Sequence, residues 1–262
     1  MVKSSYISKN LTQRQIDLLL IIEANELEIF SLEDLVKITG SNVNEIVENL
    51  AQKKLLLRIE KGKYCRSNFN DENVLGCFLV PDGIIAYWTA LNKHALTEQF
   101  SNTIFIQTLK KKNDKLFRGT HYKFIKVHPR KLIGFDTYGY GNRQYRMSNV
   151  EKTIVDCFDL IEYSGGFAEL LKAFSLSKLN SNKMIDYCMA INNIAVIKRM
   201  GFLAEIIEKP GLSAFVKFAR KKINAKYNLF DPMGEEKGEF VNDWRLRLNS
   251  SREDILEMCK IH

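Results

Sequence analysis

The stretch from Ser31 to Arg66 places the tightest constraint on the fold, because it predicts two short helices and a two-stranded ribbon with few connecting residues. Ser31 precedes LEDLVKIT and is a good N-cap, since its hydroxyl accepts hydrogen bonds from the unpaired amides of a first helical turn. Asp34 occupies the capping-box position three residues on, and Gly40 is expected to end the helix.

A second helix is predicted to begin almost at once. Asn42 and Glu45 repeat the capping-box spacing, and apolar residues recur at the helical period through NVNEIVENLAQKK. A turn of about three or four residues makes two helices cross at a wide angle, which projects the second helix outward. A helix presented in this way can enter the major groove of DNA.

A ribbon is predicted directly after this helix. LLLRIEKGKYCRS indicates two short strands, and Gly62 supplies the tight turn between them. From Lys53 to Arg66 the chain carries six Lys or Arg residues and one acidic residue. A cationic hairpin beside an outward helix is typical of a wing that lies along the DNA backbone. We therefore expect a winged helix-turn-helix over residues 1–70, with a winged helix used only for protein contact as the alternative.

The candidate DNA contacts follow from side-chain chemistry, because Asn and Gln can pair with adenine edges whereas Lys and Arg hold phosphates. The predicted base readers are Asn42, Asn44, Asn49 and Gln52, and the predicted phosphate contacts are Lys53, Lys54, Arg58, Lys61, Lys63 and Arg66. Glu45 and Glu48 do not fit a simple basic helix. We expect Glu45 to be used in capping and Glu48 to be solvated, with acceptance from a cytosine amino group as the alternative for Glu48.

Composition is that of a globular protein, with 262 residues, 45% hydrophobic residues and a formal net charge of +8. This length suffices for two domains with their own cores. The positive excess lies in residues 69–148, which hold twelve Lys or Arg against six Asp or Glu. A helix that precedes the Ser31 helix is also predicted, capped by Thr12 with Gln15 and running to about Asn25. In the first 68 residues the acids gather on these two helices, and the cations lie between residues 53 and 66. Such polarity suits a module that binds DNA with one face, although a solvated surface of mixed charge would have the same composition.

Targeting and redox signals are sparse. The first ten residues lack the apolar core of a signal peptide, and no stretch approaches the roughly 20 apolar residues that a membrane span needs. The five cysteines are scattered and never form a C-x-x-C pair, which favours reduced thiols in a cytoplasm and no structural zinc.

Residues 71–262 predict a second domain of mixed α+β type. A turn at Pro81-Asp82-Gly83 leads to a helix, a strand over NTIFIQTLK, and several short antiparallel strands up to residue 148. Ser148 is expected to cap a helix that carries Glu151 at its capping-box position. Helices follow in at least three pieces to residue 207, and the tail predicts a turn and a final strand.

A catalytic site is not expected in this domain. Glu151, Lys152, Asp156 and Asp159 stand on one predicted helix and suggest a metal-dependent nuclease, but only Glu151 and Asp159 roughly share a face, and Asp156 lies off it. Glu151 is expected to cap its own helix instead. The four histidines have no metal spacing, and no phosphate-loop or dinucleotide motif is present. We therefore expect no enzyme, no metal and no cofactor.

A further basic patch lies in the middle of the chain. It consists of Lys110, Lys111, Lys112, Lys115 and Arg118, with further bases and aromatic residues up to residue 131. It could lengthen a DNA footprint, face RNA, or be only a solvated loop.

Four blocks in a fixed order carry a resemblance to a known family. They read GIIAYWTALNKHALTEQFSNTIFIQT, MSNVEKTIVDCFDLIEYSGGFAELLKAF, MIDYCMAINNIAVIKRMGFLAEII and FVNDWRLRLN. Behind a predicted winged helix, this order resembles the AbiEi-type antitoxins over about residues 11–249. The tail NSSREDILEMCKIH, residues 249–262, predicts a further helix beyond the usual ending, for packing or dimerisation.

The resemblance implies a transcriptional autorepressor of a type IV toxin-antitoxin system that acts in abortive infection. It implies that the winged helix binds inverted repeats in the protein's own promoter. It also implies that the second domain counters a nucleotidyltransferase-like toxin in a way that does not require a stable complex. We expect this domain to act without catalysis. A protein-interaction scaffold with a vestigial winged helix remains the alternative function.

Overall fold

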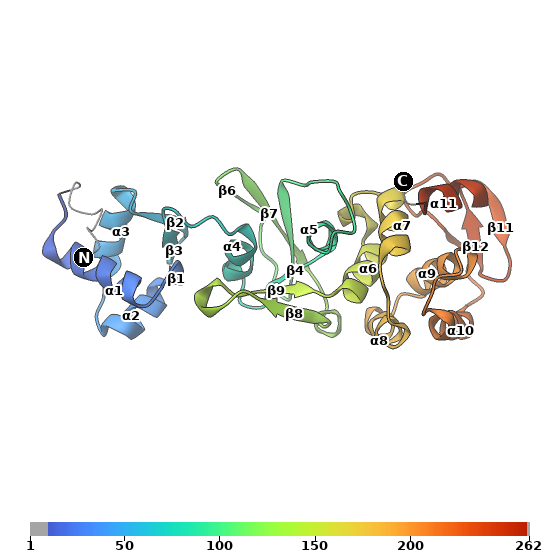
Figure 1. Ribbon diagram of the computed structural model, residues 1–262, viewed down its shortest axis with the longest axis horizontal. Helices are drawn as coiled ribbons and strands as arrows, with labels where there is room; N and C mark the ends of the chain where they lie inside the picture. Colours follow the sequence, from blue (N-terminus) through green and yellow to red (C-terminus); the bar gives the residue numbers. More distant parts are fainter. Residues whose placement is uncertain (1–9, 261–262) are drawn as a thin grey trace. The chain divides into compact units, whose positions relative to one another are not determined.

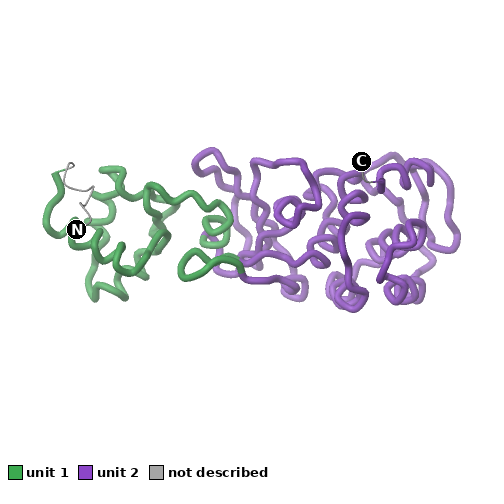
Figure 2. The backbone as a smooth tube through the Cα atoms, in the orientation of Figure 1, with its two compact units in different colours: residues 1–78, 138–145 green, residues 79–137, 146–262 purple. Residues whose placement is uncertain are grey.

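The computed structural model describes residues 10–260 and divides into two compact units (Figures 1 and 2). Unit 1 comprises residues up to 78 together with 138–145, and unit 2 comprises residues 79–137 and 146 onward. The first unit therefore extends beyond the predicted boundary at residue 70 and takes in a short segment from the middle of the chain. The molecule is of mixed α+β type.

Unit 1 is built from short helices and a small sheet. Its elements are α1 (Gln13–Ala24), β1 (Ile29–Ser31), α2 (Leu32–Thr39), α3 (Asn44–Gln52), β2 (Leu56–Glu60), β3 (Lys63–Arg66) and most of α4 (Glu72–Leu79). The sheet has the order β1-β3-β2, with both pairings antiparallel. Leu18, Leu35, Val47, Leu50 and Tyr64 form the centre of its apolar core.

Local capping explains where α1 and α2 begin. Thr12 with Gln15, and Ser31 with Asp34, form complete capping boxes, as predicted for both helices. Gly40 ends α2 with φ +68°, in the left-handed region that favours glycine.

The start of α3 differs from the prediction. Its N-cap is Val43, which makes no side-chain cap bond. The Asn42 side chain instead accepts from the amide of Asn44 at 3.0 Å, and Glu45 takes no part. A second difference is β1, a strand of three residues that was not predicted and that pairs with β3.

Unit 2 contains a six-stranded sheet and a three-stranded sheet. The larger has the order β6-β7-β5-β4-β9-β8, and its strands are β4 (Ile84–Ile85), β5 (Thr103–Thr108), β6 (Lys115–Phe117), β7 (Thr120–Lys126), β8 (Phe135–Tyr138) and β9 (Tyr145–Ser148). Residues 138–145, which connect β8 to β9, are the segment that belongs to unit 1. Pair β6·β7 is antiparallel as predicted, but β5·β7 and β4·β9 are parallel, so the prediction of antiparallel strands up to residue 148 is wrong for these pairs. The smaller sheet has the order β10-β12-β11, from β10 (Asn228–Leu229), β11 (Glu239–Val241) and β12 (Leu246–Leu248).

Helices form the rest of unit 2. They are α5 (Tyr87–Lys93), α6 (Val150–Asp159), α7 (Phe167–Leu176), α8 (Ser181–Ile191), α9 (Ile194–Ile206), α10 (Ser213–Lys222) and α11 (Arg252–Met258). The three pieces predicted up to residue 207 are confirmed as α7, α8 and α9, whereas α4 and α10 were not predicted. The helix predicted in the tail is confirmed as α11, and its Ile255 is buried in the core of the unit.

The cap of α6 corrects two predictions. Asn149, not Ser148, is the N-cap, and its side chain accepts from the amide of Lys152 at 3.0 Å. Glu151 does not cap its own helix. It accepts from the amide of Asn180 at 3.2 Å and lies 3.5 Å from the Lys183 ammonium.

Candidate nucleic-acid interface

The outward face of α3 is polar and carries amide and carboxylate groups. Asn44, Glu45 and Gln52 are exposed, and Asn49 is half-buried, whereas Val47 faces the core. Asn42 is also exposed, just before the helix. Four predicted base readers therefore lie on or beside α3, but Asn49 offers less of its side chain than the others.

Glu48 connects α3 to the hairpin. Its carboxylate accepts from the Tyr64 hydroxyl at 2.6 Å and lies 3.4 Å from the Arg58 guanidinium. Burial, followed by the hydrogen bond to Glu48, raises the pKa of Tyr64 to about 12. Glu48 is thus a structural link between helix and hairpin, and the expectation that it is merely solvated is wrong.

Besides Arg58, which pairs with Glu48, three of the predicted phosphate contacts have partners within unit 1. Lys53 donates to the Asn10 carbonyl and the Gln15 side chain, both at 2.9 Å. Lys63 lies 3.0 Å from the Glu60 carboxylate and donates to the Phe78 carbonyl at 3.0 Å. These bonds fix the two ammonium groups in the fold.

Arg66 is the third, and its partner is shared. Its guanidinium lies 3.9 Å from the Glu28 carboxylate, which Arg143 approaches more closely, at 2.6 Å. Asn142 also donates to the Ile29 carbonyl at 3.0 Å. Residues 138–145 were not expected in this unit, because no local pattern reveals a contact over such a sequence separation.

Lys54, Arg58 and Lys61 are exposed, and of these Arg58 also pairs with Glu48. Lys54 follows α3, and Lys61 stands in the turn between β2 and β3 next to Gly62, whose φ of +74° suits glycine. The positive charge that unit 1 presents to solvent along α3 and its hairpin therefore comes mainly from these three residues.

The further basic patch lies in unit 2, on the loop after β5 and on β6. Lys110, Lys111 and Arg118 are exposed, and Lys112 and Lys115 are half-buried. Lys112 lies over the Phe124 ring, with its ammonium 5.5 Å from the ring centroid. The patch is thus a folded surface attached to β7.

The α6 residues that were considered for a nuclease site have partners within the fold. Lys152 and Asp156 form a buried ion pair, and burial raises the pKa of Asp156 although Lys152 opposes this shift. Asp159 is bound elsewhere, to Lys131 at 2.6 Å and Asn193 at 2.9 Å. Within residues 10–260, no group of three His, Cys, Asp or Glu side chains is arranged to hold a metal ion.

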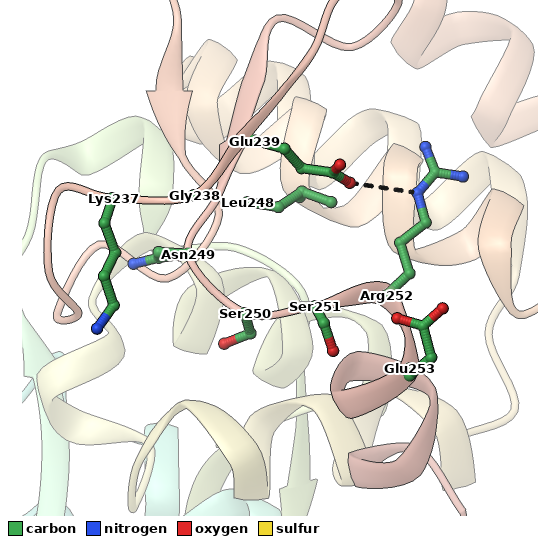
Figure 3. A pocket seen from close by; sticks show the side chains of 9 residues that line it. All are labelled: Lys237, Gly238, Glu239, Leu248, Asn249, Ser250, Ser251, Arg252 and Glu253. Carbon is green, nitrogen blue, oxygen red and sulfur yellow. Dashed lines mark ion pairs between the residues drawn. The ribbon is translucent and has the colours of Figure 1, made fainter.

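A pocket of about 700 Å³ lies near the end of unit 2 (Figure 3). It is lined by Lys237, Gly238, Glu239, Leu248, Asn249, Ser250, Ser251, Arg252 and Glu253. The Glu239 carboxylate lies 4.0 Å from the Arg252 guanidinium within it, and Lys237 pairs with Glu235. Its charges are balanced and its charged side chains are exposed, so it offers no evident ligand chemistry. No helix in the described part of the chain is long and apolar enough to cross a membrane.

Comparisons with known proteins establish the fold only. No protein-family model matches the chain, and no curated protein matches it. Among solved structures, the RV2827C protein from Mycobacterium tuberculosis is similar, with a TM-score of 0.64 over 95% of each chain. The sequences are 11% identical, so this similarity concerns the arrangement of the backbone.

Proposed function

We propose that unit 1 is a winged helix-turn-helix that binds duplex DNA, and that the protein is a transcriptional autorepressor. The observation that carries the proposal is the order α1-β1-α2-α3-β2-β3 with the sheet β1-β3-β2. This order supports the proposal, because a recognition helix and a wing would require a helix such as α3 after a short turn and a hairpin such as β2–β3 after it.

In this proposal α3 enters the major groove and the hairpin lies along the backbone. Asn44 and Gln52 contact base edges, together with Asn42 just before the helix and the half-buried Asn49 between them. Lys54, Arg58 and Lys61 hold phosphates, since they are exposed. Lys53, Lys63 and Arg66 contribute through their charge while they keep their contacts within unit 1.

The sequence resemblance extends the proposal to the rest of the chain. Its four blocks lie in α5 and β5, in α6 and α7, in α8 and α9, and at β11 and β12. On that basis unit 2 acts as a cytoplasmic antitoxin of the AbiEi type, countering a nucleotidyltransferase-like toxin without catalysis. The winged helix then represses its own promoter at inverted repeats.

A protein-interaction scaffold is the second candidate function. It is favoured by the carboxylates of Glu45 and Glu48 on α3 and by the exposed apolar side chains of Val36 and Ile38 on α2. Carboxylates repel phosphates, and exposed apolar side chains suit protein contacts.

A gel-shift titration with the DNA upstream of the coding sequence separates these candidates. A repressor gives a discrete shifted band at 50 mM salt that weakens by at least tenfold at 200 mM salt. The absence of a shift at 50 mM salt would exclude the repressor. The antitoxin role is tested separately, by growth of cells that express the neighbouring nucleotidyltransferase with and without this protein; no rescue would exclude it.

A further inference from the structure

Unit 2 concentrates positive charge on β6, β7 and the loops that flank them. Residues 109–131 hold nine Lys or Arg and a single acid, Asp114. Asp114 accepts from the Phe124 amide at 3.3 Å, and Asp82 accepts from the Thr108 hydroxyl at 2.8 Å and the Leu109 amide at 2.5 Å. Both carboxylates therefore accept hydrogen bonds from this region, and Asp82 also interacts electrostatically with Lys110.

Several of these cations lie along one face of β7. Lys115 pairs in register with Tyr122, Lys112 lies over Phe124, and Lys126 continues the same alternation. Lys126 stands opposite Thr108, so it ends close to the loop that carries Lys110 and Lys111. We call Lys110, Lys111, Lys112, Lys115 and Lys126 the basic face. At roughly 3.3 Å per residue, the four steps of β7 from Tyr122 to Lys126 give it a length of about 13 Å.

Not every cation of the region is available to a ligand. Lys123 lies 5.3 Å from the centroid of the Tyr163 ring, and Lys131 pairs with Asp159. In contrast, Lys111, Lys115 and Lys126 have no carboxylate within ion-pairing distance in residues 10–260. An anionic partner would supply the charge that the fold does not.

An exposed aromatic ring stands at the other end of β7. Phe100 is 88% exposed, the most of any large apolar side chain that the structure describes. Its loop is held against the β6–β7 turn, because Asn102 donates to the Gly119 carbonyl at 2.7 Å and accepts from the His121 amide at 3.0 Å. A ring presented in this way can stack on an unpaired base, whereas a duplex hides the faces of its bases.

We propose that this part of unit 2 binds single-stranded nucleic acid, with phosphates on the basic face and a base stacked on Phe100. The combination of a cationic track and an exposed aromatic ring is the usual basis of such binding. The surface does not depend on duplex binding by unit 1. Single-stranded DNA and RNA both offer phosphates and unpaired bases. Comparing the two in the same assay measures whether the surface prefers the 2′-hydroxyl of RNA.

The test uses fluorescence anisotropy of the full chain with labelled dT16, U16 and a 16-base-pair duplex at several salt concentrations. The variant Lys111→Ala/Lys115→Ala/Lys126→Ala removes three charges from the basic face. The matched control Lys217→Ala/Lys221→Ala/Lys222→Ala removes three exposed charges from α10 in the same unit. Thermal unfolding of each variant shows that it is folded.

We expect the basic-face variant to bind a single strand at least tenfold more weakly, with a salt slope lower by about 2, since each phosphate contact contributes roughly 0.7. The α10 variant should change affinity less than threefold. Phe100→Ala should weaken binding about fivefold or more with no change in slope. Equal losses in the two triple variants, or tighter binding of the duplex at this face, would overturn the proposal. Arg58→Ala/Lys61→Ala in unit 1 should leave single-strand binding unchanged, so this result is independent of the proposed repressor.

Discussion

Arg143 donates to the carboxylate of Glu28 at 2.6 Å, although 115 residues separate them in the sequence. The contact lies beside β1, an edge strand of the sheet in unit 1, where the Asn142 side chain also donates to the Ile29 carbonyl. It borders a pocket of about 350 Å³ that includes Arg66 and Tyr140. The segment 138–145 is therefore part of the fold of unit 1 and not a loop in solvent.

The first prediction concerns this ion pair. The Arg143 side chain is 44% exposed and that of Glu28 13%, so solvent screens the interaction. We expect a double-mutant cycle of Arg143→Ala and Glu28→Ala, measured by urea unfolding, to give a coupling free energy of roughly 0.3–1 kcal/mol. A coupling free energy of zero would show that the segment does not rest on Glu28.

The second prediction concerns the carboxylate of Glu45 on α3. If α3 faces DNA, Glu45→Gln should raise affinity for the promoter duplex about threefold, because a repulsion worth somewhat less than 1 kcal/mol in water is removed. Glu33→Gln is the matched control, because Glu33 is also exposed but lies on α2. Equal effects of the two substitutions would argue that α3 does not approach the backbone.

The third prediction concerns Asp82, which holds the start of the basic face. Burial alone would raise its pKa, but the hydrogen bonds from Leu109 and Thr108 outweigh burial and lower it. A lowered pKa in the folded state stabilises the protein above the unfolded value of about 3.9, and this stability is lost as pH falls through the folded value. Asp82→Ala should therefore lower the Tm at pH 7 by about 3–6 °C, from roughly 1.5 kcal/mol of lost hydrogen bonding, and much less at pH 3.

Asp136→Ala is the control for this prediction, since Asp136 is exposed on β8. Its Tm should change by less than about 1 °C at either pH. A destabilisation by Asp82→Ala that is the same at pH 7 and pH 3 would mean that the ionised carboxylate is not the stabilising form.

The fourth prediction concerns Gly201 in α9. A Cβ atom there would lie 2.5 Å from two ring atoms of Trp244 and 2.7 Å from the Ala219 Cβ. Gly→Ala stabilises an exposed helix by about 1 kcal/mol, but overpacking a core costs about 1–3 kcal/mol. Gly201→Ala should therefore lower the Tm, and Trp244→Phe in the same chain should recover part of the loss. A raised Tm for Gly201→Ala alone would contradict this packing.

Local signals were sufficient for some of this structure. The capping boxes at Thr12 and Ser31 and the turn at Gly62 depend on residues three or fewer positions apart, and each is present. Strand β1 was missed because its three residues form a strand only through pairing with β3. The predicted direction of β7 relative to β5 was wrong, because alternation shows which face of the sheet a side chain is on but not whether the neighbouring strand is parallel or antiparallel.

The candidate site shows the same division. Asn44 and Gln52 could be placed on the outward face from sequence, because the apolar positions of α3 recur at the helical period and define the opposite, buried face. Sequence could not show that Glu48 binds Tyr64 or that Lys53 binds Gln15, because those partners come from other elements. The distinction between exposed cations and cations held inside unit 1 required the tertiary structure.

The most direct test of the account is the salt dependence of promoter-duplex binding by Lys54→Ala/Arg58→Ala/Lys61→Ala, measured by anisotropy beside wild type and the α10 variant. Each lost phosphate contact should lower the slope of log affinity against log salt by about 0.9. The account predicts a slope lower by about 2.7 and affinity at least thirtyfold weaker, with the α10 variant close to wild type. If Lys54→Ala/Arg58→Ala/Lys61→Ala binds the duplex as tightly as the α10 variant does, with the same salt slope, the account is contradicted.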